Sequence, residues 1–235
     1  MTRIREILAT SPVMPVIVLE RVEDAVPLAR ALVAGGIRVL EVTMRTPAAL
    51  DCVRAIREQV PEAIVGVGTI VSVVDFDAAV AAGAMFGVSP GSTYSLLTHA
   101  AKHAFPFLPG CMTPSDLMRV MAFGFDAVKL FPAKQAGGIE MLKALGGPFP
   151  NILFCPTGGI DVASAPGYLQ LPNVACVGGS WLAPSSLVTN GDWDGIRLRA
   201  EAASALRGGS PLLHPTQPTH PTQHTHQTPQ TEAAR

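Results

Sequence analysis

The stretch AVPLARALVAGGIRVLEVTM, residues 25–44, decides the fold because it joins one amphipathic helix to one strand. The apolar residues of its first half stand at positions i, i+3, i+4, i+7 and i+8, which form one stripe that packs against a sheet (Ala25, Leu28, Ala29, Leu32 and Val33). The pair Gly35-Gly36 is typical of a left-handed helix stop. A strand-like run, Arg38–Met44, follows at once.

The same joint recurs along the chain. Ala82-Gly83-Ala84 and Phe123-Gly124-Phe125 each precede a new strand-like run, and such runs start every roughly 20–26 residues. Strands that alternate with single helices imply parallel pairing and right-handed crossovers. We predict an α/β fold with a single (β/α)8 TIM barrel over residues 1–207, and an open doubly wound sheet is the alternative. The predicted strands are Val13–Val18, Arg38–Met44, Ala63–Ile70, Met85–Ser89, Phe105–Pro109, Asp126–Phe131, Ile152–Thr157 and Val174–Gly178.

The overall composition excludes several classes of protein. The 235 residues carry a formal net charge of −1, so no basic field attracts nucleic acid or an acidic membrane. No apolar run approaches the roughly 18 residues of a membrane helix. The cysteines form no CxxC motif, which favours free thiols and a cytoplasmic location (Cys52, Cys111, Cys155 and Cys176). A mean hydropathy of +0.34 favours an oligomer.

The composition changes abruptly at Gly208. Residues 208–235 are rich in Pro, Thr, Gln and His and have almost nothing to bury, so we expect a disordered tail. Its four histidines could hold a metal loosely, but their spacing matches no compact ligand set (His214, His220, His224 and His226). We therefore expect a solvated tail without a catalytic role.

Lys129 is one of only four lysines and lies in the apolar run Asp126–Pro132. Burial disfavours a charged ammonium, and the neutral amine is the form that attacks a carbonyl. Lys129 is thus a candidate nucleophile. The alternative is a lysine that reaches the barrel mouth or pairs with a carboxylate for a structural purpose.

The second predicted strand carries polar residues on one face. Glu41, Thr43 and Arg45 stand at i, i+2 and i+4, while the residues between them are apolar. The outer face of a parallel barrel meets helices, so we expect the polar set to point inward. A buried Glu41–Arg45 ion pair with structural purpose alone is the alternative.

Glycine pairs follow the last two predicted strands. The seventh strand runs into Thr157-Gly158-Gly159, and the eighth runs into Gly178-Gly179-Ser180. Phosphate sites in such barrels are built from these loops, with exposed backbone N–H groups and a helix amino terminus. We predict an anion site here, although no lysine or arginine stands nearby in the sequence and plain turns are the alternative.

With these motifs in hand, the chain resembles the 2-keto-3-deoxy-6-phosphogluconate (KDPG) aldolases, which are class I aldolases. The resemblance covers roughly residues 5–205 with the motifs in order. The matching motifs are PVIV (15–18), VLEVTMRT (39–46), VGVGT (65–69), SPG (89–91), LPG (108–110), KLFPA (129–133), FCPTGGI (154–160) and GGSW (178–181).

The resemblance implies a role for each matching residue. Lys129 is expected to form the Schiff base, and Glu41 to move protons. The expected substrate-binding residues are Arg45 and Thr69 for the pyruvate carboxylate, Pro90 and Phe131 for the pocket wall, and Thr157, Gly158, Gly159, Gly179 and Ser180 near the phosphate. The implied partners are a 2-oxo acid and a sugar phosphate, and the implied assembly is a homotrimer without metal or cofactor.

The expected reaction is cleavage of KDPG to pyruvate and glyceraldehyde 3-phosphate. The nearest rival is the same chemistry on unphosphorylated 4-hydroxy-2-oxoglutarate (KHG), which gives pyruvate and glyoxylate. A second rival is a metal-dependent aldolase, which no HxxH or paired-carboxylate ligand set supports. A third is a non-catalytic sugar-phosphate-binding barrel in which Lys129 merely pairs with Glu41.

Overall fold

The structure of the protein is a computed structural model that describes residues 3–207. The helices are α1 (Arg3–Ala9), α2 (Ala25–Ala34), α3 (Ala49–Gln59), α4 (Val73–Ala81), α5 (Tyr94–Ala100), α6 (Pro114–Ala122), α7 (Gly138–Gly146), α8 (Ala165–Leu169), α9 (Ser185–Thr189) and α10 (Trp193–Ser204), with 3-10 turns at Val22–Asp24 and Ala205–Arg207. The strands are β1 (Val13–Ile17), β2 (Val39–Thr43), β3 (Ile64–Gly68), β4 (Gly87–Val88), β5 (Phe107–Leu108), β6 (Gly110–Cys111), β7 (Ala127–Leu130), β8 (Leu153–Pro156) and β9 (Val177–Gly179).

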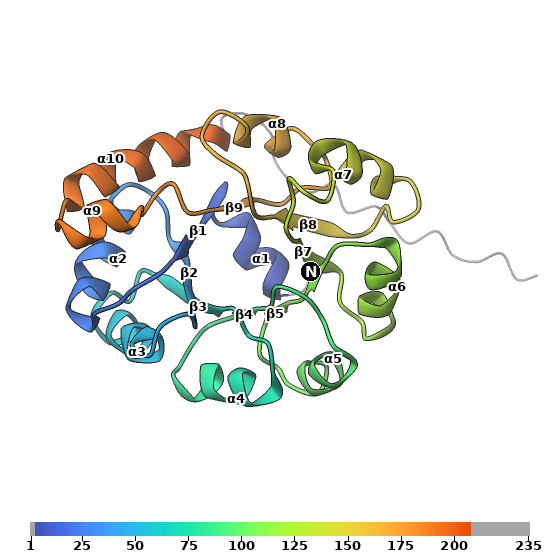
Figure 1. Cartoon of the computed structure of the whole chain (residues 1–235), viewed down its shortest axis with the longest axis horizontal. Coiled ribbons are helices and arrows are strands. Elements are labelled where there is room, and N and C mark those ends of the chain that lie inside the picture. The colour runs from blue at the N-terminus through green and yellow to red at the C-terminus, as the bar shows by residue number, and fades with distance from the viewer. Residues whose placement is uncertain (1–2, 208–235) are drawn as a thin grey trace, which may run out of the picture.

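The strands form curled parallel sheets surrounded by helices (Figure 1). A six-stranded sheet has the order β5-β4-β3-β2-β1-β9, and a three-stranded sheet has the order β6-β7-β8. Two isolated parallel bridges, Phe154 with Val174 and Thr157 with Gly178, connect the β8 segment to the segment that leads into β9. The predicted α/β class with parallel strands is therefore confirmed, in the form of two curled sheets.

The predicted fifth strand differs most from the structure. It begins at Phe107 rather than Phe105, and it continues past Pro109 as β6. Proline has no N–H to give to a ladder, so the run divides there into β5 and β6. The carbonyl of Pro109 still accepts a hydrogen bond from the backbone N–H of Lys129 at 2.9 Å.

The helix boundaries follow local sequence rules. Gly36 and Gly83 have φ angles of 87° and 80°, so both adopt the predicted left-handed stop. Helix α6 begins with a capping box, in which Thr113 accepts from the backbone of Asp116 and the Asp116 carboxylate accepts from the backbone of Thr113. Helix ends of this kind fix where each strand starts.

The core has two parts. The larger part lies between the strands and the outer helices. The smaller part is formed by α1, which the sequence analysis did not predict and which lies across the strands in Figure 1. Ile4 and Leu8 of α1 share this cluster with Val39 and Ala127, the first residues of β2 and β7. Helix α1 therefore closes the amino-terminal end of the strands.

Two further predictions concern the chain as a whole. All four cysteines are buried free thiols, as expected. Burial raises the pKa of Cys52 to about 11 and that of Cys111 to about 12, so both stay protonated near neutral pH. Within residues 3–207, no helix has the length and apolar character that crossing a membrane requires. The predicted tail, residues 208–235, lies outside the described residues.

Candidate active site

Lys129 and Glu41 form a buried ion pair on the inner face of the curled sheets. The Nζ of Lys129 on β7 donates to Oε1 of Glu41 on β2 at 3.0 Å, and Oε2 lies at 3.4 Å. Only 6% of the Lys129 side chain and 0% of the Glu41 side chain are exposed. The lysine predicted to be buried is therefore buried, and its partner comes from a strand 88 residues away in the sequence.

The strand alternation explains why Glu41 points inward. Leu40 and Val42 pack in the outer core cluster, so Glu41 and Thr43 face the interior. Room for the carboxylate comes from Gly68 on the neighbouring strand β3, where any Cβ would overlap the Glu41 side chain. Glycine at this position thus lets the carboxylate lie directly against the backbone.

The other two residues of the predicted polar face, Thr43 and Arg45, do not take part in the ion pair with Lys129. The hydroxyl of Thr43 donates to the carbonyl of Ile17 at 2.8 Å, so it ties β2 to β1. Arg45 is exposed in the turn after β2, and within residues 3–207 it forms no ion pair. The alternative Glu41–Arg45 ion pair is therefore wrong, and Arg45 is exposed rather than buried beside Glu41 because the strand ends at Thr43.

Phe131 and Pro90 lie near Lys129. The Phe131 ring centroid is 5.5 Å from Lys129 Nζ, and the ring edge reaches Gly158, where an added Cβ would be 3.3 Å from it. Gly110 is opposite Lys129 in the parallel register. The backbone of Pro90 lies so close to Gly110 that a side chain there would overlap it. Both residues therefore stand where a pocket wall is expected.

Thr69 has an unusual backbone. It directly follows β3 and has a φ of 65°, the left-handed region that β-branched residues rarely adopt. Its preceding residue is Gly68, which lies against the Glu41 carboxylate. Strained residues of this kind cluster at binding and catalytic sites, where surrounding structure holds them in place.

The two glycine loops lie next to each other. Thr157 and Gly178 form a parallel bridge, which brings the loop after β8 beside the end of β9. Gly158 and Gly159 have φ angles of 101° and 73°, and neither donates its backbone N–H to an atom of residues 3–207. Ser180, which follows β9, is exposed.

The expected helix amino terminus is not at these glycines. Helix α8 begins at Ala165 and α9 at Ser185, several residues past the loops. A helix dipole directly behind the glycines was therefore a wrong expectation for the described chain. Several residues of turn separate each strand from the helix that follows it. The backbone N–H groups available at the glycines therefore belong to the loops and not to a helix.

A lysine that sequence reasoning overlooked lies beside this loop. The side chain of Lys134 packs against Gly159, where an added Cβ would be 2.7 Å from its Cβ and 2.9 Å from its Cδ. The backbone N–H of Lys134 also donates to the carbonyl of Gly158 at 3.1 Å. The pKa of Asp161 is lowered mainly by its hydrogen bonds with Ser164, and the charge of Lys134 lowers it further.

The predicted binding residues lie at or just past the carboxyl ends of strands. Because parallel strands end at one edge, this edge gathers the side chains of Arg45, Thr69, Pro90, Phe131, Thr157 and Ser180. Ligands of open and closed parallel α/β folds bind at this edge. A buried amine held by a carboxylate, in a fold whose loops at this edge offer free backbone donors, fits the chemistry of a lyase that works through a lysine imine.

Comparison with known proteins agrees with this class. The family model described as KDPG and KHG aldolase matches residues 4–198, and the chain belongs to this family. It is 51% identical over 201 residues to the 2-dehydro-3-deoxy-phosphogluconate aldolase of Pseudoalteromonas atlantica, with 86% of this chain and 94% of that protein covered. It is 49% identical over 202 residues to the KHG/KDPG aldolase of Escherichia coli K12, with 86% and 95% covered.

Solved structures extend the comparison. A KDPG aldolase from Legionella pneumophila, with pyruvate captured at low pH as a covalent carbinolamine intermediate, aligns with a TM-score of 0.85 and 47% identity over 86% of this chain and 98% of that one. The KDPG aldolase of Zymomonas mobilis ZM4 with 3-phosphoglycerate aligns with a TM-score of 0.84 and 44% identity over 88% and 97%. The predicted family resemblance is therefore confirmed.

Proposed function

We propose that the protein cleaves KDPG to pyruvate and glyceraldehyde 3-phosphate through an imine on Lys129. The observation that carries this proposal is the buried pair of Lys129 Nζ and Glu41 Oε1 at 3.0 Å. Relatives from Pseudoalteromonas, Dickeya and Zymomonas named 2-dehydro-3-deoxy-phosphogluconate aldolase support the same substrate.

The first half of the reaction builds the imine. Glu41 accepts a proton from the Lys129 ammonium, and the neutral amine attacks the C2 ketone to give a carbinolamine. Glu41 returns the proton to the carbinolamine hydroxyl, which leaves as water, and an iminium ion remains. The carbinolamine trapped with pyruvate in the Legionella relative supports this intermediate.

The second half breaks the carbon–carbon bond. The Glu41 carboxylate takes the proton of the C4 hydroxyl, the C3–C4 electron pair becomes the C2=C3 bond of an enamine while the C=N π pair moves onto the nitrogen, and glyceraldehyde 3-phosphate leaves as the aldehyde. The resulting enamine accepts a proton at C3, and water hydrolyses the imine to release pyruvate and regenerate Lys129. One carboxylate serves each transfer because it lies within hydrogen-bond reach of the amine.

The pyruvate end of the substrate lies near Thr69 and Arg45 in this proposal. Arg45 is exposed and forms no ion pair within residues 3–207, so its guanidinium is available for a substrate carboxylate. Thr69 adds a hydroxyl from a backbone held in the left-handed region. Pro90 and Phe131 form the wall beside Lys129.

The phosphate end lies at the glycine loops. Gly158 and Gly159 offer backbone N–H groups, Gly179 and Ser180 stand on the adjoining loop, and buried Thr157 joins the two loops. Lys134 beside Gly159 supplies a positive charge. These donors favour phosphorylated KDPG over KHG, the other substrate in the name of the Escherichia coli relative.

The two sheets together make one closed (β/α)8 barrel in our proposal, over residues 1–207. Support comes from the run of β5 and β6 across Pro109, which pairs with β4 on one side and β7 on the other. The bridge between Thr157 and Gly178 supports closure between β8 and β9. Residues 208–235 form a separate tail in this scheme.

We further propose that the chain works as a cytoplasmic homotrimer without a catalytic metal or cofactor. The family resemblance supports the trimer, and exposed Val74 and Tyr94 supply apolar surface for contacts between copies. Free thiols at all four cysteines support a reducing compartment.

The test is borohydride trapping with pyruvate, followed by mass spectrometry of the intact protein and its peptides. One reduced pyruvate adduct on Lys129 is expected, and Lys129→Ala is expected to give none. Lys134→Ala is the matched control and should still be trapped, because it lies outside the imine chemistry. A folded protein that forms no adduct contradicts the proposal. The ratio of kcat/KM for KDPG and KHG then tests the phosphate preference.

A further inference from the structure

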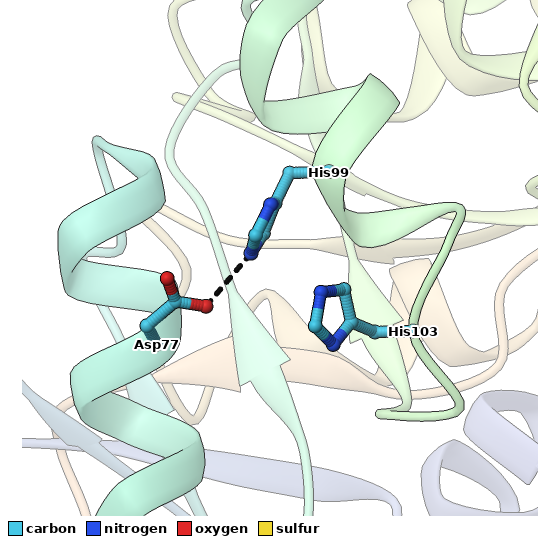
Figure 2. A group of neighbouring side chains, drawn as sticks. All are labelled: Asp77, His99 and His103. Carbon is cyan, nitrogen blue, oxygen red and sulfur yellow. Dashed lines mark hydrogen bonds and ion pairs between the residues drawn. The ribbon is translucent and has the colours of Figure 1, made fainter.

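A cluster of metal-ligating side chains lies on the outer helices, apart from the catalytic pair. Figure 2 shows Asp77 on α4 facing His99 and His103, with one ligand atom from each residue within 4.8 Å of the others. These are the only two histidines of the chain that precede residue 214. The cluster therefore holds both imidazoles of residues 3–207.

The local backbone explains why the two rings meet. His99 lies in the last turn of α5, and His103 follows four residues later. The backbone N–H groups of Lys102 and His103 bond to the carbonyls of His99 and Ala100, so the chain makes one more turn beyond the helix. Residues at i and i+4 share a face of such a turn, and the His99 and His103 ring centroids are 4.4 Å apart.

Phe76 holds both imidazoles in position. This ring is fully buried, and it meets His99 edge-on at a centroid distance of 5.1 Å and His103 at 5.4 Å. Phe76 directly precedes Asp77, so one segment of α4 supplies both the support and the third ligand. Rings that are already ordered lose less conformational entropy when they bind an ion.

The ligand atoms, which lie within 4.8 Å of one another, would rearrange around a bound ion. His99 Nε2 and Asp77 Oδ1 are 2.7 Å apart as a hydrogen-bonded pair. Two ligand atoms of a tetrahedral zinc ion with bonds of about 2.0–2.1 Å stand about 3.3 Å apart. Zinc would replace the proton between nitrogen and oxygen, and the ring of His103 would close toward the same point.

We propose that Asp77, His99 and His103 form a zinc site that links α4 to α5. Two imidazoles and one carboxylate match the nitrogen and oxygen donors that zinc prefers, and they leave a fourth position for water. His103 also lines an open cavity of about 250 Å³, so solvent reaches the site. His103 comes shortly before Phe107, where β5 begins, so the site lies toward the amino ends of the strands and outside the lyase reaction.

The test uses the untagged full-length chain in which the tail histidines are substituted, so that only the proposed site can supply imidazole. The substitutions are His214→Gln, His220→Gln, His224→Gln and His226→Gln. Isothermal titration with Zn²⁺ should give one ion per chain. His99→Ala, His103→Ala and Asp77→Asn should each weaken binding at least about tenfold, because each removes a ligand.

A matched control is Asp51→Asn, which removes an exposed aspartate of a different outer helix that pairs with Arg54, and it should leave zinc binding unchanged. Co²⁺ provides a second probe, since a tetrahedral ion shows visible absorption bands that the ligand variants should lose. Circular dichroism and KDPG cleavage, unchanged in every variant, establish that the chains are folded.

Absence of zinc binding in the tail-substituted chain overturns the site. Binding that survives His99→Ala and His103→Ala overturns it as well. Loss in both histidine variants with full binding in Asp77→Asn overturns the three-residue set.

Discussion

The two ends of the same strands have opposite chemistry. At the amino end of β2 and β7, Val39 and Ala127 pack against Leu8 of α1 in an apolar cluster. Two residues further along the same strands stand Glu41 and Lys129, the buried ion pair. A single strand thus carries an apolar core residue and, two residues further on the same face, a member of the buried ion pair to which we assign the chemistry.

This difference teaches how a charged pair is kept in an apolar interior. The apolar cluster closes one end of the strands, and the glycine loops and polar side chains lie at the other end. Catalytic rate and stability then depend on different residues. Substitutions at the carboxyl end should change rates, and substitutions at the amino end should change the free energy of unfolding.

The largest effect is expected for Lys129→Ala, which should abolish KDPG cleavage because no imine can form. It should also lower the free energy of unfolding by about 3–5 kcal/mol, because Glu41 is left as an unpaired buried charge. Adding Glu41→Gln to this variant should restore part of that stability but no activity. Steady-state kinetics and urea unfolding measure the two effects, and retained turnover would remove the Schiff-base mechanism.

Glu41→Gln alone should lower kcat by about 10²–10⁴-fold, the range for loss of a general acid–base group. The amide keeps the shape of the side chain over Gly68 but cannot take the C4 hydroxyl proton. Borohydride should still trap pyruvate on Lys129. Normal turnover in this variant would contradict the proton-transfer role of Glu41.

At the opposite end, Leu8→Ala should lower the free energy of unfolding by about 2–5 kcal/mol, because Leu8 is fully buried and leaves a cavity. The kcat for KDPG should stay unchanged below the melting temperature. Leu198→Ala on α10 is the control, since 56% of that residue is exposed and its loss should cost less than about 0.5 kcal/mol. A fall in kcat with unchanged stability in Leu8→Ala would contradict the assignment of stability to the amino end and of catalysis to the carboxyl end.

The smallest effect is expected for Lys134→Ala. An exposed charge contributes about 0.2–1 kcal/mol to a pair, so KM for KDPG should rise by up to about fivefold while kcat is unchanged. The kinetics with KHG should not change, because that substrate has no phosphate. Lys143→Ala, which breaks only the ion pair with Glu140 on α7, should leave both substrates unaffected. Equal effects on KDPG and KHG would place Lys134 away from the phosphate.

Sequence rules that span a few residues were enough to predict the features that depend only on neighbouring residues. The alternation in β2 was enough to place Glu41 inside, because a strand has period two and one face meets helices. Glycine after an amphipathic stripe was enough to mark helix ends such as Gly36 and Gly83.

Contacts between distant segments were beyond these rules. The pairing of Lys129 with Glu41 spans 88 residues and depends on how the strands curl, which no short window contains. Arg45 was misplaced because the pattern does not reveal that the strand stops at Thr43. Lys134 was overlooked because its position beside Gly159 is created only when the loop after β7 meets the loop after β8. Helix α1 escaped notice because seven residues give a weak helical pattern.

The pairing of the first strand with the last has a consequence for biosynthesis. Val13 of β1 lies opposite Val177 of β9, so one edge of β1 has no partner until almost the whole fold has been translated. At about 5–20 residues per second, that delay is on the order of ten seconds or longer. Long-range parallel pairing is also intrinsically slow. The nascent chain therefore presents an open apolar strand edge on the ribosome, and chaperone supply should govern its yield more than the stability of the finished protein does.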